Sequence, residues 1–389
     1  MNKLRRFSSL FILLSAPLAL LGVSGKVPPS PAKSYRAYVG TYTAKTNSKG
    51  IYEFDFHPAS GKMSAVQVAG ESKDPSWVVV HPRGKYLYSV NETGKASTVS
   101  AFAIEPNSGK LTLLNQMPAL GEDPCYLSFD NSGKFLFVAN YTSGNVTVFP
   151  ILADGRLGEH TSLVQDTGPT GSNKERQKGP HAHWIKPSND NHLVYVADLG
   201  LDRVLIYNFE SSTGKLSYLP ASASAEAWRA AALAPGTGPR HAAFSGESLY
   251  VLGELQSTVT LFFRGAGPGL LTLQRISTLP PDFKGRNDGA EIEIHPNGRF
   301  LYASNRGHDS IAVFSIEGLT LNRVAIVPTG GKEPRHFAID PTGNFLLAEN
   351  QLSDTIVEFR IDPATGKLTP TGETLGVASP VCIAFLPIQ

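Results

Sequence analysis

The chain has 389 residues, of which 41% are hydrophobic and only 17% are charged, with 37 glycines and 28 prolines. This apolar fraction is too high for a disordered chain, and the many glycines and prolines favour short strands with tight turns over long helices. The formal net charge of +2 gives no indication of a nucleic-acid or anionic-membrane partner.

The first 25 residues are typical of a secretory signal peptide. Three basic residues precede an interrupted apolar run that ends in small residues, "SLFILLSAPLALLGVSG", and a cleavage near Gly25 is expected. We therefore predict that residues 1–25 are removed on export, that the mature protein is periplasmic or secreted, and that it has no membrane span. A retained N-terminal anchor is the alternative. Removal of three basic and no acidic residues leaves a nearly neutral mature chain.

A repeat governs the rest of the chain. Its unit is a proline, a short apolar strand, a turn such as His-Pro-x-Gly-Arg, a second strand that ends in Asn, Asp or Glu, and then a third strand. Copies begin 44 to 59 residues apart, at Asp74, Asp123, Gly179, Gly238, Gly289 and Glu333. Segments such as "SGKLTLL" and "TGKLSYL" add a fourth strand. Four short antiparallel strands at this period are typical of a β-propeller.

A seventh unit is divided between the two ends of the chain. The C-terminal "SPVCIAFLP" is a lone first strand, while "RAYVGTYT", "GIYEFDFH" and "GKMSAVQV" are second, third and fourth strands without a first. Joining them closes the ring and removes open sheet edges. We therefore predict one all-β domain over residues 34–389, a seven-bladed β-propeller with four antiparallel strands per blade.

The chain has only two cysteines, Cys125 and Cys382. They occupy the same position of the repeat, "DPCYLSF" and "SPVCIAF", in strands assigned to different sheets. We therefore predict two buried free thiols rather than a disulfide.

Polar residues gather at one face of the predicted ring. The first and second strands of a blade are antiparallel, so residues before the first strand and after the second lie on the same face, near the axis. This rule collects carboxylates, imidazoles, guanidinium groups and their polar neighbours around one expected pit: Thr41, Tyr42, Asn91, Glu92, Asn140, Tyr141, His181, His183, Asp198, Arg240, His241, Glu254, Asp288, Glu291, Asn305, Arg306, Arg335, His336, Glu349 and Asn350. Two long insertions, Gln165–Gly179 and Pro280–Asp288, lie on the same face.

These residues could instead have purely structural roles. Asn and Asp terminate strands because they turn chains well, and Asn140 and Asn350 are assigned such structural roles. The arginines could simply pair with neighbouring carboxylates. Charged residues that differ from blade to blade, such as His181, Glu254 and Arg306, favour a functional site over a structural repeat. His181, His183 and Asp198 could instead chelate a metal, but a further ligand is not evident, and no metal is assigned. The glycine-rich "GTGPR" and "GAGPG" do not join a strand to a helix, so no phosphate-binding loop is indicated.

Several segments together resemble the seven-bladed lactonase family, which includes propeller-type 6-phosphogluconolactonases and the fungal 3-carboxy-cis,cis-muconate lactonizing enzyme. They are "YVGTYT", "QKGPHAHW", "PGTGPRHAAF", "HPNGRFLYASNRGHDSIAVF" and "SPVCIAF". The resemblance covers the mature chain and implies lactone chemistry without a metal or organic cofactor. It implies a catalytic cluster of His181 or His183 with Arg240, Glu254 and Arg306. Asp198, His241, Glu291, Asn305, Arg335 and His336 are expected to bind substrate.

Lactone hydrolysis needs a base to activate water and donors to stabilise an oxyanion. Glu254 or a neutral histidine could be the base, and Arg240 and Arg306 could bind the oxyanion or an anionic substituent. The expected substrate is a small sugar lactone, 6-phosphogluconolactone by resemblance, or an unphosphorylated aldonolactone if the protein is exported. A muconate-type cycloisomerase and a non-catalytic binding module are the alternatives, since fold alone does not decide function.

Overall fold

The computed structural model describes residues 33–219, 230–265 and 269–388. The chain separates into the units Met1–Pro31 and Ala32–Gln389, and the described residues all belong to the second. The proposed signal peptide, residues 1–25, lies outside the described residues and stays a prediction. Across the described part of the chain, no helix is long and apolar enough to cross a membrane.

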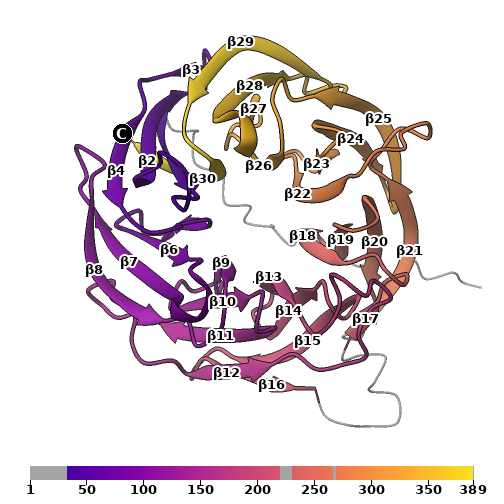
Figure 1. Ribbon diagram of the computed structural model, residues 1–389, viewed down its shortest axis with the longest axis horizontal. Coiled ribbons are helices and arrows are strands. Elements are labelled where there is room, and N and C mark those ends of the chain that lie inside the picture. Colours follow the sequence, from indigo (N-terminus) through magenta and orange to yellow (C-terminus); the bar gives the residue numbers. More distant parts are fainter. Residues whose placement is uncertain (1–32, 220–229, 266–268, 389) are drawn as a thin grey trace, which may run out of the picture. The chain divides into compact units, whose positions relative to one another are not determined.

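Seven antiparallel sheets follow one another around a ring in the described unit (Figure 1). We number them as blades 1 to 7 from the sheet that contains β1. Blade 1 contains β1 (Ser34–Thr41), β2 (Gly50–His57), β3 (Lys62–Met63), β4 (Gln67–Glu71) and β30 (Pro380–Ile388). Blade 2 contains β5 (Val78–Val80), β6 (Tyr86–Asn91), β7 (Thr98–Ile104) and β8 (Leu111–Pro118). Blade 3 contains β9 (Pro124–Phe129), β10 (Phe135–Asn140), β11 (Asn145–Pro150) and β12 (Ser162–Gln165).

The remaining blades repeat this order, and two short 3-10 helices, η1 (Gly94–Ala96) and η2 (Gln351–Ser353), lie in loops. Blade 4 contains β13 (Ala182–Pro187), β14 (Leu193–Asp198), β15 (Arg203–Glu210), β16 (Lys215–Tyr218) and β17 (Ala230–Ala232). Blade 5 contains β18 (Pro239–Ser245), β19 (Ser248–Gly253), β20 (Thr258–Arg264) and β21 (Leu270–Ser277). Blade 6 contains β22 (Asp288–Ile294), β23 (Phe300–Arg306), β24 (Ser310–Glu317) and β25 (Thr320–Pro328). Blade 7 contains β26 (Pro334–Ile339), β27 (Phe345–Asn350), β28 (Thr355–Ile361) and β29 (Leu368–Gly376). The predicted seven-bladed β-propeller is confirmed.

The ring closes as predicted, through the C-terminal strand. β30 is antiparallel to β1, with partners running from Ser34–Ile388 to Gly40–Cys382, and it occupies the innermost position of blade 1. Cys125 and Cys382 are both free and buried in different sheets, in agreement with the sequence.

The outer strand departs from the simple prediction in two blades. In blade 1 the fourth strand is divided into β3 and β4, which both pair with β2. In blade 4 it is divided into β16 and β17, which both pair with β15. An outermost strand has a partner on one side only, so an interruption there removes few ladder bonds and leaves the four-position blade intact.

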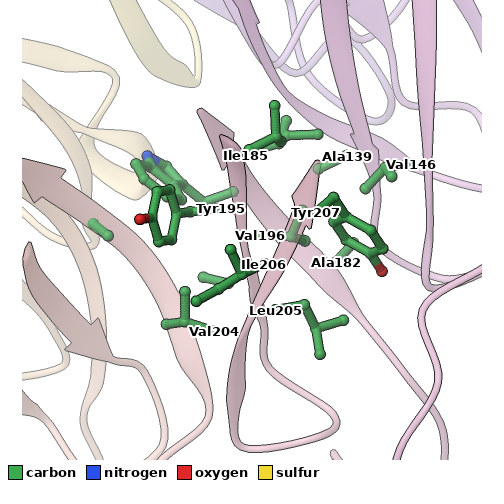
Figure 2. Packing of buried hydrophobic residues seen from close by; sticks show 14 of the residues in the cluster. Ala139, Val146, Ala182, Ile185, Tyr195, Val196, Val204, Leu205, Ile206 and Tyr207 are labelled. Carbon is green, nitrogen blue, oxygen red and sulfur yellow. The ribbon is translucent and has the colours of Figure 1, made fainter. Parts of the chain in front are cut away.

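Apolar side chains from neighbouring blades interlock between the sheets. Figure 2 shows one such junction, where Ala139 and Val146 of blade 3 face Ala182, Val196 and Tyr207 of blade 4. All five are inaccessible to solvent. Burial of each large apolar side chain contributes about 1.5–3 kcal/mol. Apolar and polar residues alternate little along the inner strands because both faces of a blade are covered by its neighbours.

Tyrosine hydroxyls add a polar link between blades. Tyr38, Tyr88 and Tyr302 occupy equivalent positions in second strands. Each donates a hydrogen bond to a glycine carbonyl in the next blade, at Gly109, Gly155 and Gly366, over 2.8–2.9 Å. These bonds satisfy hydroxyls that would otherwise be buried without a partner.

A bulge at the entrance of the inner strands positions the polar residues. In blade 5, Pro239 pairs with Gly253 and His241 with Leu252, so Arg240 is an extra residue without a partner. His183, Arg335 and Cys125 are the corresponding extra residues of blades 4, 7 and 3. A bulge breaks the alternation of a strand and redirects the side chain at that point.

Removal of the closing strand tests the dependence of the ring on β30. Deletion of residues 380–389 exposes one edge of β1 and uncovers its apolar neighbours. We expect the truncated protein to aggregate or to lose cooperative unfolding, as followed by size-exclusion chromatography and denaturant titration. Deletion of residues 388–389 alone is the control. A monomeric 380–389 deletion with the wild-type unfolding midpoint would contradict this account.

Candidate active site

Three arginines surround one buried carboxylate at the axial face of blade 5. Glu254 Oε1 lies 2.5 Å from Arg176 Nη2, and Glu254 Oε2 lies 3.1 Å from Arg240 Nε and 3.0 Å from Arg306 Nη2. Only 4% of the Glu254 side chain is exposed. We call Glu254 and these arginines the arginine cluster.

The charges of the arginine cluster fix the ionisation of Glu254. Burial alone would raise the pKa of this carboxyl, but Arg306 and Arg240 outweigh it and hold the pKa well below its usual range. Burial, together with the nearby Arg306 and Arg335, lowers the pKa of Arg240 to about 10. Positive charge therefore exceeds negative charge here. A lowered pKa makes Glu254 a poor proton acceptor, which argues against its role as the base.

Backbone carbonyls orient two of these arginines. Arg240 Nη1 donates to Ala290 O over 2.5 Å, and Arg306 Nη2 donates to Gly289 O over 3.3 Å. The Nε atom of Arg306 is buried without a hydrogen-bond partner among the described residues, whereas Arg240 Nε has the carboxylate of Glu254 at 3.1 Å. Buried donors of this kind are expected to be satisfied by water or by a ligand.

Arg176 comes from the insertion Gln165–Gly179, which the sequence indicated as a functional loop without naming this residue. Gln177 anchors the loop, since its side chain donates to Leu199 O over 2.8 Å and to Asp202 Oδ1 over 2.7 Å. Arg176 itself also donates to Tyr141 Oη over 3.1 Å. The loop therefore brings a third guanidinium to Glu254 from outside the repeat.

His181 lies beside the arginine cluster and is half-buried. Its ring stacks on Tyr141 with centroids 4.7 Å apart, and its Nδ1 lies 2.9 Å from Tyr141 O. A carbonyl oxygen can only accept, so Nδ1 carries the proton and Nε2 of the neutral ring is free to accept one. The backbone N–H of His181 donates to Asp198 Oδ1 over 2.9 Å.

His183 is a bulge residue that is almost fully buried. Its Nδ1 lies 3.6 Å from the Cys125 Sγ atom, and its ring contacts Tyr141 and His241. Burial and Arg240 hold the pKa of His183 well below its ordinary value. The ring is therefore neutral, but it is a weak base.

A second carboxylate at this face, Glu92, is held by hydroxyl groups. Glu92 Oε2 accepts hydrogen bonds from Tyr42 Oη over 2.7 Å and from Ser76 Oγ over 2.5 Å. Arg335 Nη2 donates to Tyr42 Oη over 2.8 Å, and its guanidinium lies over the Tyr42 ring. We call these four residues the Glu92 group. Against the lowering effect of burial, the charges of both Glu92 and Glu254 raise the pKa of Arg335, so this arginine links the two groups electrostatically.

A third group contains two histidines and two glutamates. His241 Nδ1 lies 2.9 Å from Glu291 Oε2, and His336 lies 3.4 Å from the same oxygen and 2.5 Å from Glu349 Oε2. Burial lowers the pKa of both imidazoles and raises the pKa of both carboxyls. Glu291 and His336 line a cavity of about 610 Å³ between the inner strands.

Two predicted substrate-binding residues lie within the fold. The Asn305 amide is buried and bonds to Thr278 and Ser310. Asp198 is buried and accepts the backbone N–H groups of His181 and Leu201. These bonds support strand ends and the backbone at His181.

The predicted set thus divides into groups. Six of its residues belong to the arginine cluster or the Glu92 group or lie beside them: His181, His183, Arg240, Glu254, Arg306 and Arg335. Three more belong to the third group: His241, Glu291 and His336. The second-strand rule also collected Tyr42, Glu92 and Tyr141, but no catalytic or substrate-binding role was assigned to them, and Arg176 was not named. Tyr42, Glu92 and Tyr141 directly follow second strands, as Glu254 does, so position placed them at this face without indicating their roles. Among the described residues, no group of three or more His, Cys, Asp or Glu side chains is arranged to hold a metal ion.

Comparison with known proteins assigns this chain to one family. The family model "Lactonase, 7-bladed beta-propeller" matches residues 36–385, so the chain belongs to the seven-bladed β-propeller lactonase family. Family membership places it among the lactonases, which are hydrolases.

Named relatives cover nearly the whole chain. A 6-phosphogluconolactonase of Bacillus subtilis is 37% identical over 90% of this chain and 98% of its own length. The structure of the periplasmic gluconolactonase of Pseudomonas aeruginosa superposes with a TM-score of 0.85 at 30% identity, over 92% of this chain and 100% of that one. A candidate 6-phosphogluconolactonase of Bacteroides fragilis superposes with a TM-score of 0.83 at 35% identity, over 91% and 98%.

Replacement of Glu254 by Gln tests the arginine cluster. The substitution leaves buried Arg240 without its counter-charge, so we expect the free energy of unfolding at pH 7 to fall by about 3–5 kcal/mol, as measured by denaturant titration. The folded-state pKa of Glu254 is depressed below the ordinary 4.5, so its stabilisation is present above that pH and is lost as the pH falls. Wild type and Glu254→Gln should therefore converge in acid. The exposed neighbour Glu175→Gln is the control, and an equal loss in both variants would refute the assignment.

Proposed function

We propose that this protein hydrolyses an unphosphorylated aldonolactone to the open hydroxy acid, outside the cytoplasm. The observation that carries the proposal is the excess of guanidinium groups around one ionised carboxylate, next to a histidine whose neutral tautomer is fixed. The predicted signal peptide and the likeness to a periplasmic gluconolactonase support an extracytoplasmic, unphosphorylated substrate.

In this mechanism His181 is the base. Neutral His181 takes a proton from water through Nε2 while the oxygen attacks the lactone carbonyl carbon. The carbonyl oxygen gains negative charge in the tetrahedral intermediate. Arg306 and Arg335 are half-buried and supply the nearby positive charge that stabilises this oxyanion.

Glu254 serves as an anchor in this mechanism rather than as a base. Its carboxylate holds the arginines in fixed positions before substrate binds, so little reorganisation is needed when charge develops. The buried Arg306 Nε donor, which has no partner among the described residues, supports a role in binding an anionic group.

A second candidate substrate is 6-phosphogluconolactone. The excess positive charge of the arginine cluster would also suit a phosphate group, and the Bacillus subtilis relative is named for this activity.

The two substrates can be separated directly. Acid release from glucono-δ-lactone and from its 6-phosphate is followed at constant pH with purified protein, after correction for spontaneous hydrolysis. We expect kcat/KM for the unphosphorylated lactone to be at least tenfold higher. A tenfold preference for the phosphate ester would transfer the assignment to the second candidate, and no acceleration of either would remove lactone hydrolysis as the function.

Histidine variants test the base. We expect His181→Ala to lower kcat about 100-fold or more, since general base catalysis typically contributes 10²–10⁴-fold. His183→Ala should reduce kcat by less than about tenfold because its buried ring is a weak base. The exposed His192→Ala in the same blade is the control. The reverse order of effects would assign the base to His183.

A further inference from the structure

We propose that Glu92 is the general acid of this lactonase, which protonates the ring oxygen as the lactone opens. This inference deepens the function proposed above and rests on it. Glu92 follows β6 in blade 2 and is half-buried at the axial face, and the charges of both Glu92 and Glu254 act on Arg335.

The hydrogen bonds of Glu92 distinguish its two oxygens. Tyr42 and Ser76 both direct hydroxyl groups to Oε2, at 2.7 and 2.5 Å. Tyr42 Oη is in turn the acceptor for Arg335 Nη2, so its own proton is directed to Glu92. Because both donors are directed at Oε2, this oxygen is the acceptor whether the carboxyl group is ionised or protonated. The acidic proton therefore belongs on Oε1, which is left without a partner among the described residues.

The surroundings of the two carboxyl groups differ in kind. Glu254 has three arginines within 3.1 Å, whereas no cation is in direct contact with Glu92 in the described residues. Burial raises the pKa of Glu92, and Asp123 raises it further, against the lowering effects of Arg335, Ser76 and Tyr42. The pKa of Glu254 moves in the opposite direction. Two carboxyl groups with pKa values pushed apart take different roles, the protonated one as the acid.

The reaction balances with this assignment. Water adds to the carbonyl carbon as His181 accepts a proton from it. The tetrahedral intermediate then collapses, the bond between the carbonyl carbon and the ring oxygen breaks, and the electron pair goes to the ring oxygen. That oxygen takes the proton from Glu92, and the product is a hydroxy acid. Proton exchange with solvent returns His181 to neutral and Glu92 to its acid form.

A comparison of two lactones isolates the acid. An alkyl lactone such as δ-valerolactone leaves as a strongly basic alkoxide and needs protonation, whereas dihydrocoumarin leaves as a phenolate and does not. We expect Glu92→Gln to lower kcat for δ-valerolactone about 100-fold or more, with KM little changed, and to lower kcat for dihydrocoumarin less than threefold. The exposed Glu317→Gln is the matched control.

Each outcome decides a separate question. Equal loss on both lactones in a folded Glu92→Gln protein would make Glu92 structural, and retention of δ-valerolactone hydrolysis would exclude it as the acid. If wild type opens these lactones but no sugar lactone, the proposed substrate fails while Glu92 remains testable.

Tyr42→Phe provides a second, independent measurement. It removes a hydrogen bond that lowers the pKa of Glu92, so the alkaline limb of the kcat–pH profile for δ-valerolactone should move to higher pH. An unmoved alkaline limb would count against Glu92 as the acid, even if Glu92→Gln does not fold.

Discussion

The antiparallel run of the two innermost strands in each blade is the constraint on which the site depends. It returns the end of the second strand to the face where the first begins, so each blade presents two short segments to the same axial region. Seven repetitions assemble side chains that are far apart in sequence, from Tyr42 in blade 1 to Arg335 in blade 7, which share a hydrogen bond. Closure by β30 fixes the spacing between blades and therefore the geometry of the whole site.

Burial of charge at this face is tolerated because the charges compensate one another. Glu254 would be costly to bury alone, and so would Arg240. Together with Arg176 and Arg306 they form a compact group of three cations and one anion, which leaves an excess of two positive charges. The Glu92 group uses hydroxyl donors instead of cations around its carboxyl. The same face thus holds an ionised carboxylate and one that is biased towards its acid form, at positions that the fold treats as equivalent.

Much of the fold could be predicted from the sequence because the repeat has a period, turn residues and a divided seventh unit, all of which are local patterns. The common face of Arg240 and Glu254 also followed from strand direction alone. The bulges could not be predicted, since an extra residue such as Arg240 or His183 alters register without altering composition. A regular strand would place Arg240 and the adjacent His241 on opposite faces of its sheet. With the bulge, Arg240 contacts Glu254 and His241 contacts Glu291. The contribution of Arg176 could not be predicted from the repeat either, because this residue lies in an insertion outside it.

The pairing of β1 with β30 also bears on how the molecule reaches its native state. These strands lie at opposite ends of the described chain, so the contact that completes blade 1 joins residues such as Arg36 and Leu386. Contacts between such distant residues cost the most loop-closure entropy and are formed slowly. β1 consequently lacks its inner partner until residues 380–388 have been synthesised, and a chain that stops before them keeps an open strand edge. Resistance to aggregation therefore depends on the presence of β30, which covers the inner edge of β1.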